Sequence, residues 1–332
     1  MRVRSRLTAI IFICALFLAA PSRGQAEATP ELVVPPHTRL LVVSPHPDDG
    51  TLAGAGLIAR VLATGGHVRI LQITSGDAFA NGVKAIANTD RPTPDDYRRY
   101  GALRERETVS AMAVVGVRRK AITFLGFPDD GLCRLVSDYR SAALAYESPY
   151  TKRDSPPVME QIVRGAAYRG DDAERELERV AAEFRPTMVL VPSARDEHPD
   201  HCSTHLLVHS ALAAAGLHPQ VMHFLIHYGV WPPETDGIGP ASAQKLTPPV
   251  RLRTADMHWL SLTLTPGESR MKSRALAAYQ SQVLAIGPFL KAFERVNELF
   301  AEGDPETIAP CWCRGQDVAG ARTKPAATAI HP

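Results

Sequence analysis

The alternation of short apolar runs with longer helical patterns constrains the fold of this chain more than any other feature. The strand-like runs are 38–44, 68–74, 121–126 and 187–192. The helical patterns between them are 51–62, 97–115 and 171–184. Strands that alternate with helices form βαβ units, which build a parallel sheet with helices on both faces. We therefore predict an α/β fold with a Rossmann-like, largely parallel sheet covered by helices.

The pattern changes after residue 217. Strand-like runs at 220–228 and 256–265 are separated by proline-rich segments, so this C-terminal part of the sheet is predicted to be mixed or antiparallel. A last helix is predicted over Ser269–Glu302. Gly, Ala, Thr and Pro dominate residues 311–332, which predicts a flexible tail after a single domain over 29–310.

The N-terminus has the pattern of an export signal. Three arginines within the first six residues precede an uncharged apolar run, Leu7–Ala20. This run is shorter than the ~20 residues that span a bilayer, and Ala26 and Ala28 provide the small residues of a cleavage site. We predict a signal peptide over residues 1–28, no stable membrane span after its removal, and a periplasmic or secreted protein.

The net charge of the chain limits the classes of partner that it is expected to bind. The formal net charge is +2, and removal of the signal peptide takes away four arginines and one glutamate, which leaves the mature chain close to neutral. Nucleic-acid binders concentrate positive charge, so a nucleic-acid partner is not expected.

The cysteines that remain after removal of the signal peptide are Cys133, Cys202, Cys311 and Cys313. In an oxidising compartment a disulfide is expected among them, although their spacing does not give the pairing.

The first chemical motif is Pro45-His46-Pro47-Asp48-Asp49-Gly50, at the carboxyl end of the first predicted strand. Open α/β sheets place their ligands at this end of the strands. An imidazole from His46 and a carboxylate from Asp49 suit a borderline-soft divalent ion. The same residues also suit a metal-free turn in which Asp49 caps the next helix.

The second motif, 196–201, follows the predicted strand 187–192 and therefore reaches the same edge of the sheet. Pro199 suits the first turn of a helix, which leaves His198 at the helix start and His201 one turn further. His205 lies four residues beyond His201 and is a rival ligand. The convergence of two His/Asp segments at one edge favours a metal site.

Two histidines and one carboxylate leave a position open for water, as catalytic zinc sites do. We predict one zinc ion per chain, because bound zinc lowers the pKa of its water to about 7 and polarises a carbonyl. Asp48 is the candidate general base. His198 is a candidate either for stabilising the oxyanion or for protonating the leaving amine.

Together these motifs resemble those of the PIG-L/LmbE-like N-deacetylases, zinc-dependent enzymes that deacetylate amino sugars. The resemblance runs from about residue 38 to 285, and the two histidine motifs are its specific part. The weaker matches are Thr74-Ser75-Gly76-Asp77, Arg104-x-x-Glu107 leading to Gly116, Phe124-Leu125-Gly126-Phe127-Pro128-Asp129 and Tyr279-x-Ser281-Gln282.

The resemblance implies that His46, Asp49 and His201 bind the metal. It also implies that Asp48 is the general base and that His198 aids the tetrahedral intermediate.

Three further roles come from the same resemblance. Asp200 is expected to orient a histidine, and Arg104 and Asp129 are expected to approach the sugar; a surface arginine and a turn aspartate are the alternatives for the last two. The family usually has glutamate where this chain has Gly50. That difference removes no ligand or base, but it puts a supporting hydrogen bond in doubt.

The leading interpretation is an exported zinc-dependent hydrolase that removes an N-acyl group, expected to be acetyl, from an amino sugar in a glycan or glycoconjugate. The same water would also hydrolyse an O-acyl sugar ester, and a non-catalytic glycan-binding protein is a third interpretation. Asp48, His198 and a full ligand set favour catalysis.

Trp231-Pro232-Pro233 suits either an aromatic wall of the pocket or a rigid loop. The sequence does not specify the sugar, the acyl group or the oligomeric state.

Overall fold

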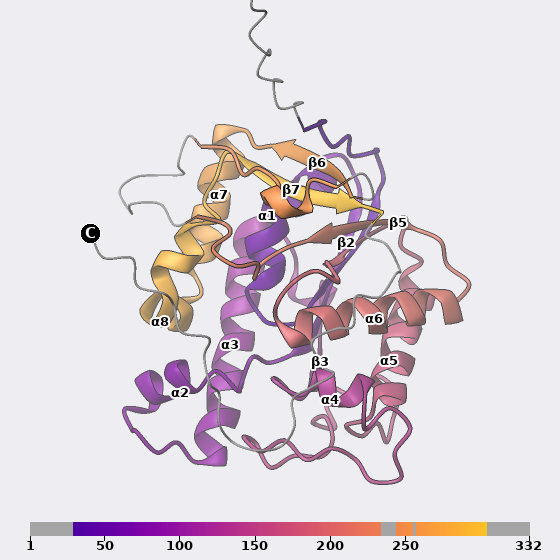
Figure 1. The fold of residues 1–332 in the computed structure, drawn as a ribbon, viewed down its shortest axis with the longest axis vertical. Coiled ribbons are helices and arrows are strands. Elements are labelled where there is room, and N and C mark those ends of the chain that lie inside the picture. Colours follow the sequence, from indigo (N-terminus) through magenta and orange to yellow (C-terminus); the bar gives the residue numbers. More distant parts are fainter. Residues whose placement is uncertain (1–28, 234–243, 255–256, 304–332) are drawn as a thin grey trace, which may run out of the picture.

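The computed structural model describes residues 29–233, 244–254 and 257–303, in which helices cover both faces of one sheet (Figure 1). The predicted signal peptide and C-terminal tail lie outside the described residues. Within the described part of the chain, no helix combines the length and apolar character needed to cross a bilayer.

The sheet has seven strands in the order β3-β2-β1-β4-β5-β7-β6. They are β1 (Arg39–Ser44), β2 (His67–Thr74), β3 (Ile122–Phe127), β4 (Met188–Pro192), β5 (Gln220–Phe224), β6 (His258–Thr263) and β7 (Asn297–Glu302). The first five in spatial order are parallel, whereas β7 pairs antiparallel with both β5 and β6. The predicted α/β class and the mixed C-terminal part are confirmed.

Successive residues of each strand pack against two different layers of helices, because side chains alternate between the two faces of a sheet. Leu40 and Val42 of β1 pack toward one layer, and Leu41 and Val43 pack toward the other. The first layer contains α1 (Asp49–Ala63), α3 (Pro94–Val115), α7 (Pro266–Ala277) and α8 (Gln280–Lys291). The second contains α4 (Leu132–Val136), α5 (Gly170–Phe184) and α6 (Pro199–Ala214). The short helix α2 (Ala80–Ala87) lies beside α3 and α8.

The predicted single helix over Ser269–Glu302 is wrong. This segment forms part of α7, then α8 and finally β7. Pro288 and a non-helical residue at Ile286 interrupt α8. Residues 297–302 are almost entirely buried, because β7 lies between β5 and β6. Within β7 only Leu299, Phe300 and Ala301 are apolar, and so short a run has no periodicity that separates a strand from a helix, which explains the error.

The expectation of a disulfide is confirmed. Cys133 on α4 and Cys202 on α6 are buried, and each is disulfide-bonded. Cys311 and Cys313 lie outside the described residues.

The neighbouring strands β1 and β4 mark the point where the chain order reverses, since β2 lies on one side of this pair and β5 on the other. The loops that follow two such strands diverge and leave a crevice at the carboxyl edge of the sheet. The two histidine motifs follow β1 and β4, so the topology brings them together.

Candidate metal centre

The turn between β1 and α1 is fixed by hydrogen bonds from other elements. The last residue of β2 donates its N–H and its hydroxyl to Pro45 O, at 3.0 and 2.9 Å. The hydroxyl of Tyr279 donates to Pro47 O at 2.9 Å. His46 and Asp49 therefore project from a backbone that β2 and the segment before α8 hold in place.

Two of the weaker motifs meet behind this turn. The Glu107 carboxylate accepts hydrogen bonds from the N–H and the hydroxyl of Ser281, at 2.8 and 2.6 Å. The side-chain amide of Gln282 donates to the Tyr100 hydroxyl at 2.6 Å. These buried bonds join α3 to α8 beside the start of α1.

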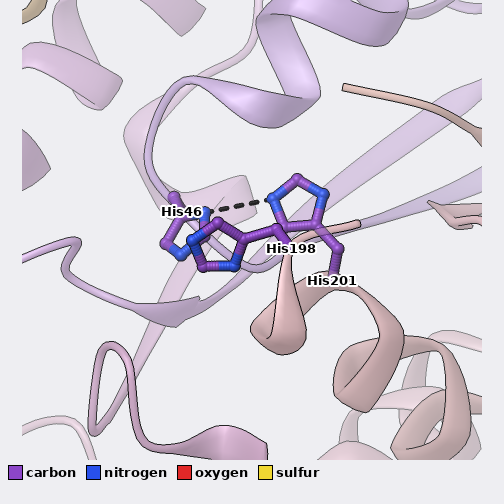
Figure 2. A group of neighbouring side chains, drawn as sticks. All are labelled: His46, His198 and His201. Carbon is purple, nitrogen blue, oxygen red and sulfur yellow. Dashed lines mark hydrogen bonds between the residues drawn. The ribbon is translucent and has the colours of Figure 1, made fainter. Parts of the chain in front are cut away.

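Three donor atoms form a nearly equilateral triangle. His46 Nδ1 lies 3.1 Å from Asp49 Oδ2 and 3.2 Å from His201 Nε2, and the last two atoms lie 3.2 Å apart. Figure 2 shows the His46 and His201 rings meeting between the β1 turn and the start of α6, with His198 beside them. Ligands of one tetrahedral zinc ion, each bonded at about 2.0–2.1 Å, lie roughly 3.3 Å apart. The triangle fits a divalent ion of this class.

Buried carboxylates lie behind both imidazoles. Asp196 Oδ2 is 3.2 Å from His201 Nδ1. Asp129 Oδ1 is 3.1 Å from His46 Nε2, and Asp200 Oδ2 is 3.6 Å from the same nitrogen. Metal-binding histidines usually donate their second ring N–H to such a carboxylate, which fixes the ring orientation.

The electrostatics of the centre favour positive charge. Burial by itself lowers the pKa of His201, but Asp196 and Asp49 outweigh it and raise this pKa to about 9. For Asp49, burial raises the pKa, yet the His201 and His46 imidazoles bring it well below its usual value. The carboxylates thus stabilise either protons on the imidazoles or a bound cation at the same place.

Asp48 forms a buried ion pair with α3. Arg104 Nη2 donates to Asp48 Oδ1 at 2.7 Å, and Arg104 Nη1 donates to Gly76 O at 2.8 Å. Both side chains are almost fully buried but still reach the wall of the cavity. The guanidinium fixes one oxygen of Asp48 beside the triangle of donor atoms.

His198 is the residue that caps the N-terminus of α6. Its Nδ1 accepts a hydrogen bond from the backbone N–H of Asp200 at 3.2 Å. A neutral imidazole that accepts at Nδ1 carries its proton on Nε2. Burial, followed by the charges of His46 and His201, lowers the pKa of His198 well below its usual value. His198 therefore offers a neutral N–H donor.

A cavity of about 740 Å³ opens over these residues. Its lining includes the side chains of both histidine motifs together with aromatic and aliphatic residues. The metal-centre and acid–base residues in the wall are His46, Asp48, Asp49, Arg104, Asp129 and His198. The apolar ones are Leu52, Phe79, Ile226, Ile286 and Phe289. Trp231, for which an aromatic wall and a rigid loop were the two alternatives, is not part of this lining; it donates to Thr247 O and packs edge-on against Phe293.

The other three predicted site residues, Asp200, Asp129 and Arg104, also lie at this centre. Asp200 is the more distant carboxylate at His46 and also accepts from the N–H groups of Asp130 and Leu132, so it anchors the turn after β3. Asp129 is the nearer carboxylate at His46. Both Asp129 and Arg104 line the cavity.

The rival ligand His205 points elsewhere. Its Nδ1 lies 3.2 Å from Pro192 O, and its ring packs against His209 and His223 rather than His201. Burial, with added effects of His209 and His223, lowers the pKa of His205 to about 2, which keeps this imidazole neutral.

Sequence reasoning did not single out two residues that the structure brings to the centre. Asp196 was recognised only as part of its motif, yet it contacts His201 and accepts from the N–H groups of Ile226 and His227. The His227 ring lines the cavity, stacked on Phe289 with centroids 5.5 Å apart. His227 lies three residues after the end of β5, whose carboxyl end reaches the same edge of the sheet, whereas the predicted run 220–228 placed this histidine inside the strand.

The structure also explains Gly50. A Cβ at this position would lie 2.6 Å from Ser44 Oγ and 3.1 Å from Val42 Cγ1. The side chains of β1 therefore fill the space that a glutamate would need.

A family model described as PIG-L, GlcNAc-PI de-N-acetylase, matches residues 41–212, which include both histidine motifs. The chain belongs to the PIG-L family. The match ends before β5, so the antiparallel strands and helices α7 and α8 lie beyond it.

Among curated PIG-L relatives, a 1D-myo-inositol 2-acetamido-2-deoxy-alpha-D-glucopyranoside deacetylase 1 of Saccharopolyspora erythraea is 29% identical over 204 residues. The match covers 60% of this chain and 61% of the relative. An enzyme of the same name from Rhodococcus opacus is 30% identical over 190 residues, which cover 54% of each protein. The chain thus spans little more than half the length of these relatives.

A deacetylase of the teicoplanin biosynthesis pathway has a similar fold. Its structure aligns with a TM-score of 0.50 and 18% identity over 79% of this chain and 96% of that one. At this identity the likeness concerns the fold alone.

Proposed function

We propose that the chain is an exported, zinc-dependent hydrolase that removes an N-acyl group, acetyl in the first instance, from an amino sugar in a glycan or glycoconjugate. The observation that carries this proposal is the meeting of three metal-type donor atoms, from His46, Asp49 and His201, beside a cavity that His46, Asp48, Asp49 and His198 line. Membership of the PIG-L family and the deacetylase names of its curated relatives support the reaction class.

His46, Asp49 and His201 are the residues that would hold the ion. Two imidazole nitrogens and one carboxylate oxygen match the ligands of catalytic zinc sites. When bound, zinc supplies a Lewis acid that polarises the acyl carbonyl and makes water more acidic. Asp196 and Asp129 keep the two imidazole rings in the orientation that presents Nε2 of His201 and Nδ1 of His46 to the same point.

Asp48 is the general base of this proposal. As the oxygen of water attacks the acyl carbon, Asp48 takes the proton that the water loses. The same carboxyl group then returns this proton to the sugar nitrogen as the C–N bond breaks, which gives a carboxylic acid and a free amine. Arg104 holds Asp48 by one oxygen, which leaves the other oxygen for proton transfer.

His198 stabilises the oxygen that becomes negative during the attack. Its Nδ1 is occupied by the Asp200 N–H, so its proton-bearing Nε2 is the donor left for substrate. A fixed donor at a developing oxyanion typically contributes about 10²–10³-fold in turnover. Because the neutral ring of His198 presents an N–H donor at Nε2, His198 is assigned to stabilising the oxyanion and not to protonating the amine.

The cavity suits a sugar with an apolar attachment. Asn81, Asp130 and Gln282 offer partners for hydroxyl groups, whereas Ile286 and Phe289 present an apolar side of the wall. A near-neutral mature chain agrees with a neutral saccharide better than with a polyanion.

Export rests on the N-terminal sequence alone. Edman sequencing of protein from fractionated cells should give a start near Thr29 in the periplasmic or extracellular fraction. An intact Met1 in a soluble cytoplasmic fraction would overturn export and leave the hydrolase proposal in place.

The activity is tested with zinc-loaded protein and a panel of N-acetyl, longer N-acyl and O-acetyl sugars, with mass spectrometry of both products. We expect equimolar acid and free amine from N-acyl sugars, and release slowed by about 10²–10⁴-fold in the Asp48→Asn variant. Release of acid only from the O-acetyl sugars would reassign the protein as an esterase. Binding of sugars without any product, at full zinc content, would favour a glycan-binding protein.

A further inference from the structure

A second group of histidines lies one turn further along α6. His205 and His209 are spaced i, i+4 on this helix, and His223 comes from the neighbouring strand β5. One ring nitrogen of each lies within 4.8 Å of those of the other two. His209 Nε2 and His223 Nε2 are 3.2 Å apart.

Backbone carbonyls set the orientation of two of these rings. His205 Nδ1 lies 3.2 Å from Pro192 O, and His223 Nδ1 lies 3.1 Å from Ala301 O. A carbonyl oxygen only accepts, so each Nδ1 carries the ring proton and each Nε2 presents a lone pair. Histidines that bind metals are oriented by contacts of this kind through their second nitrogen.

The donor set differs from that of the first centre. It consists of imidazole nitrogens alone, which select Zn²⁺, Cu²⁺ and Ni²⁺ over Mg²⁺ or Ca²⁺. His205 and His223 are about 97–98% buried, whereas His209 is partly exposed and gives access from solvent. Two histidines four residues apart on a helix, joined by a third from another element, are a recurrent way to bind zinc.

We propose that His205, His209 and His223 bind a second divalent transition-metal ion, of the zinc class, at a site separate from His46, Asp49 and His201. The ion would join β5 to α6, the helix whose first turn carries His201 of the first centre. The site is independent of the proposed hydrolase activity.

The competing interpretation is a hydrogen-bonded imidazole cluster in which His209 donates to His223 and no metal binds. The two interpretations differ in metal stoichiometry. The full-length protein is stripped with a chelator, reloaded with Zn²⁺, passed through a desalting column and analysed for zinc per chain.

We expect two zinc ions in the wild type, one in Asp49→Ala, and none in Asp49→Ala combined with His209→Gln. His209 is chosen because its partial exposure makes loss of the fold less of a risk than at the buried His223. His258→Gln, which changes an exposed histidine on β6, is the matched control and should keep one zinc in the Asp49→Ala background. Equal zinc in Asp49→Ala with and without His209→Gln would overturn the proposal, as would a wild type that holds only one ion.

Electron paramagnetic resonance of Cu²⁺ gives a readout that does not depend on zinc retention. In the Asp49→Ala background, one bound Cu²⁺ should show hyperfine splitting from three nitrogens. His223→Gln should remove this signal while circular dichroism shows the fold to be retained; if His223→Gln does not fold, His209→Gln takes its place. A spectrum unchanged by either variant would place the copper elsewhere and contradict the site.

Discussion

His46 Nδ1 and His201 Nε2 lie 3.2 Å apart although 155 residues separate them in the chain. One histidine follows β1 and the other lies in the first turn of α6, after β4. Residues 40–42 of β1 pair in parallel with residues 188–190 of β4, and this register sets the distance between the two loops. The candidate metal centre therefore depends on strand pairing. Substitutions in and around it are expected to change metal binding, turnover or stability in the ways described next.

Asp196→Asn should weaken metal binding without removing a ligand. The change takes the negative charge away from His201 Nδ1, where Asp196 Oδ2 lies at 3.2 Å. Loss of such a partner typically costs about 10–100-fold in metal affinity. Zinc affinity is measured by competition with a chromophoric chelator, and Asp90→Asn at an exposed position is the control. Wild-type affinity in Asp196→Asn would contradict the role of this carboxylate.

Asp48→Asn should keep the metal and lose most of the turnover. The amide has nearly the shape of the carboxylate, but it takes no proton from water. General-base contributions of about 10²–10⁴-fold set the size of the loss. Steady-state kinetics on the best N-acyl sugar, with zinc content measured in parallel, gives the answer; turnover close to wild type in a folded, metal-loaded variant would eliminate this role.

Arg104→Gln should destabilise the protein, because it leaves the buried Asp48 carboxylate without its cation. Breaking a buried pair in this way costs about 3–5 kcal/mol of unfolding free energy. The same change in an Asp48→Asn background should cost much less, since the uncompensated charge is then absent. Urea unfolding of the four proteins forms a double-mutant cycle. Strictly additive effects would show that the pair is not coupled.

Gly50→Ala should destabilise the fold by roughly 1–3 kcal/mol through overpacking. The new Cβ would lie 2.6 Å from Ser44 Oγ. Among the described residues this hydroxyl has no hydrogen-bond partner, so Ser44→Ala removes the clash at little cost. Thermal unfolding should therefore show the double variant Ser44→Ala/Gly50→Ala to be more stable than Gly50→Ala alone. Equal melting temperatures would mean that the conflict lies with Val42.

Glu176 on α5 should make stability depend on pH. Burial raises its pKa from 4.5 to about 7, so between these values the folded state binds more protons than the unfolded state. Its contribution to the free energy of unfolding is therefore fully present below pH 4.5 and is lost as pH rises through about 7.

Glu176→Gln should flatten the pH profile over that range by roughly 1–2 kcal/mol, once solvent screening is allowed for. The glutamine oxygen can still accept from the N–H groups of Ile162 and Val163. Urea unfolding at pH 5 and pH 8 measures the effect, with Glu183→Gln at an exposed position of the same helix as the control. A wild-type pH profile in Glu176→Gln would refute the prediction.

Local patterns determined the elements that carry the site. Apolar runs of strand length with helical patterns between them predicted β1, α1 and β4 to within a few residues, and Pro199 marked the start of α6. The position of His46 and His201 after two such strands was enough to predict that they meet, because parallel strands end at one edge of a sheet. The prediction for segment 269–302 failed at its end, since the three apolar residues of β7 are too few to show the periodicity that distinguishes a strand from a helix.

The tertiary structure alone decided which side chains touch. The sequence placed Asp196 and Asp200 in one motif and implied a role only for Asp200, and only the fold places Asp196 at His201 and Asp200 behind His46 with Asp129. It likewise pairs Arg104 with Asp48 and turns His205 toward His223. The sequence determined the faces and ends of its elements, because hydrophobic periodicity is local. Contacts between side chains from different elements depend on strand register and helix packing, which no local pattern records.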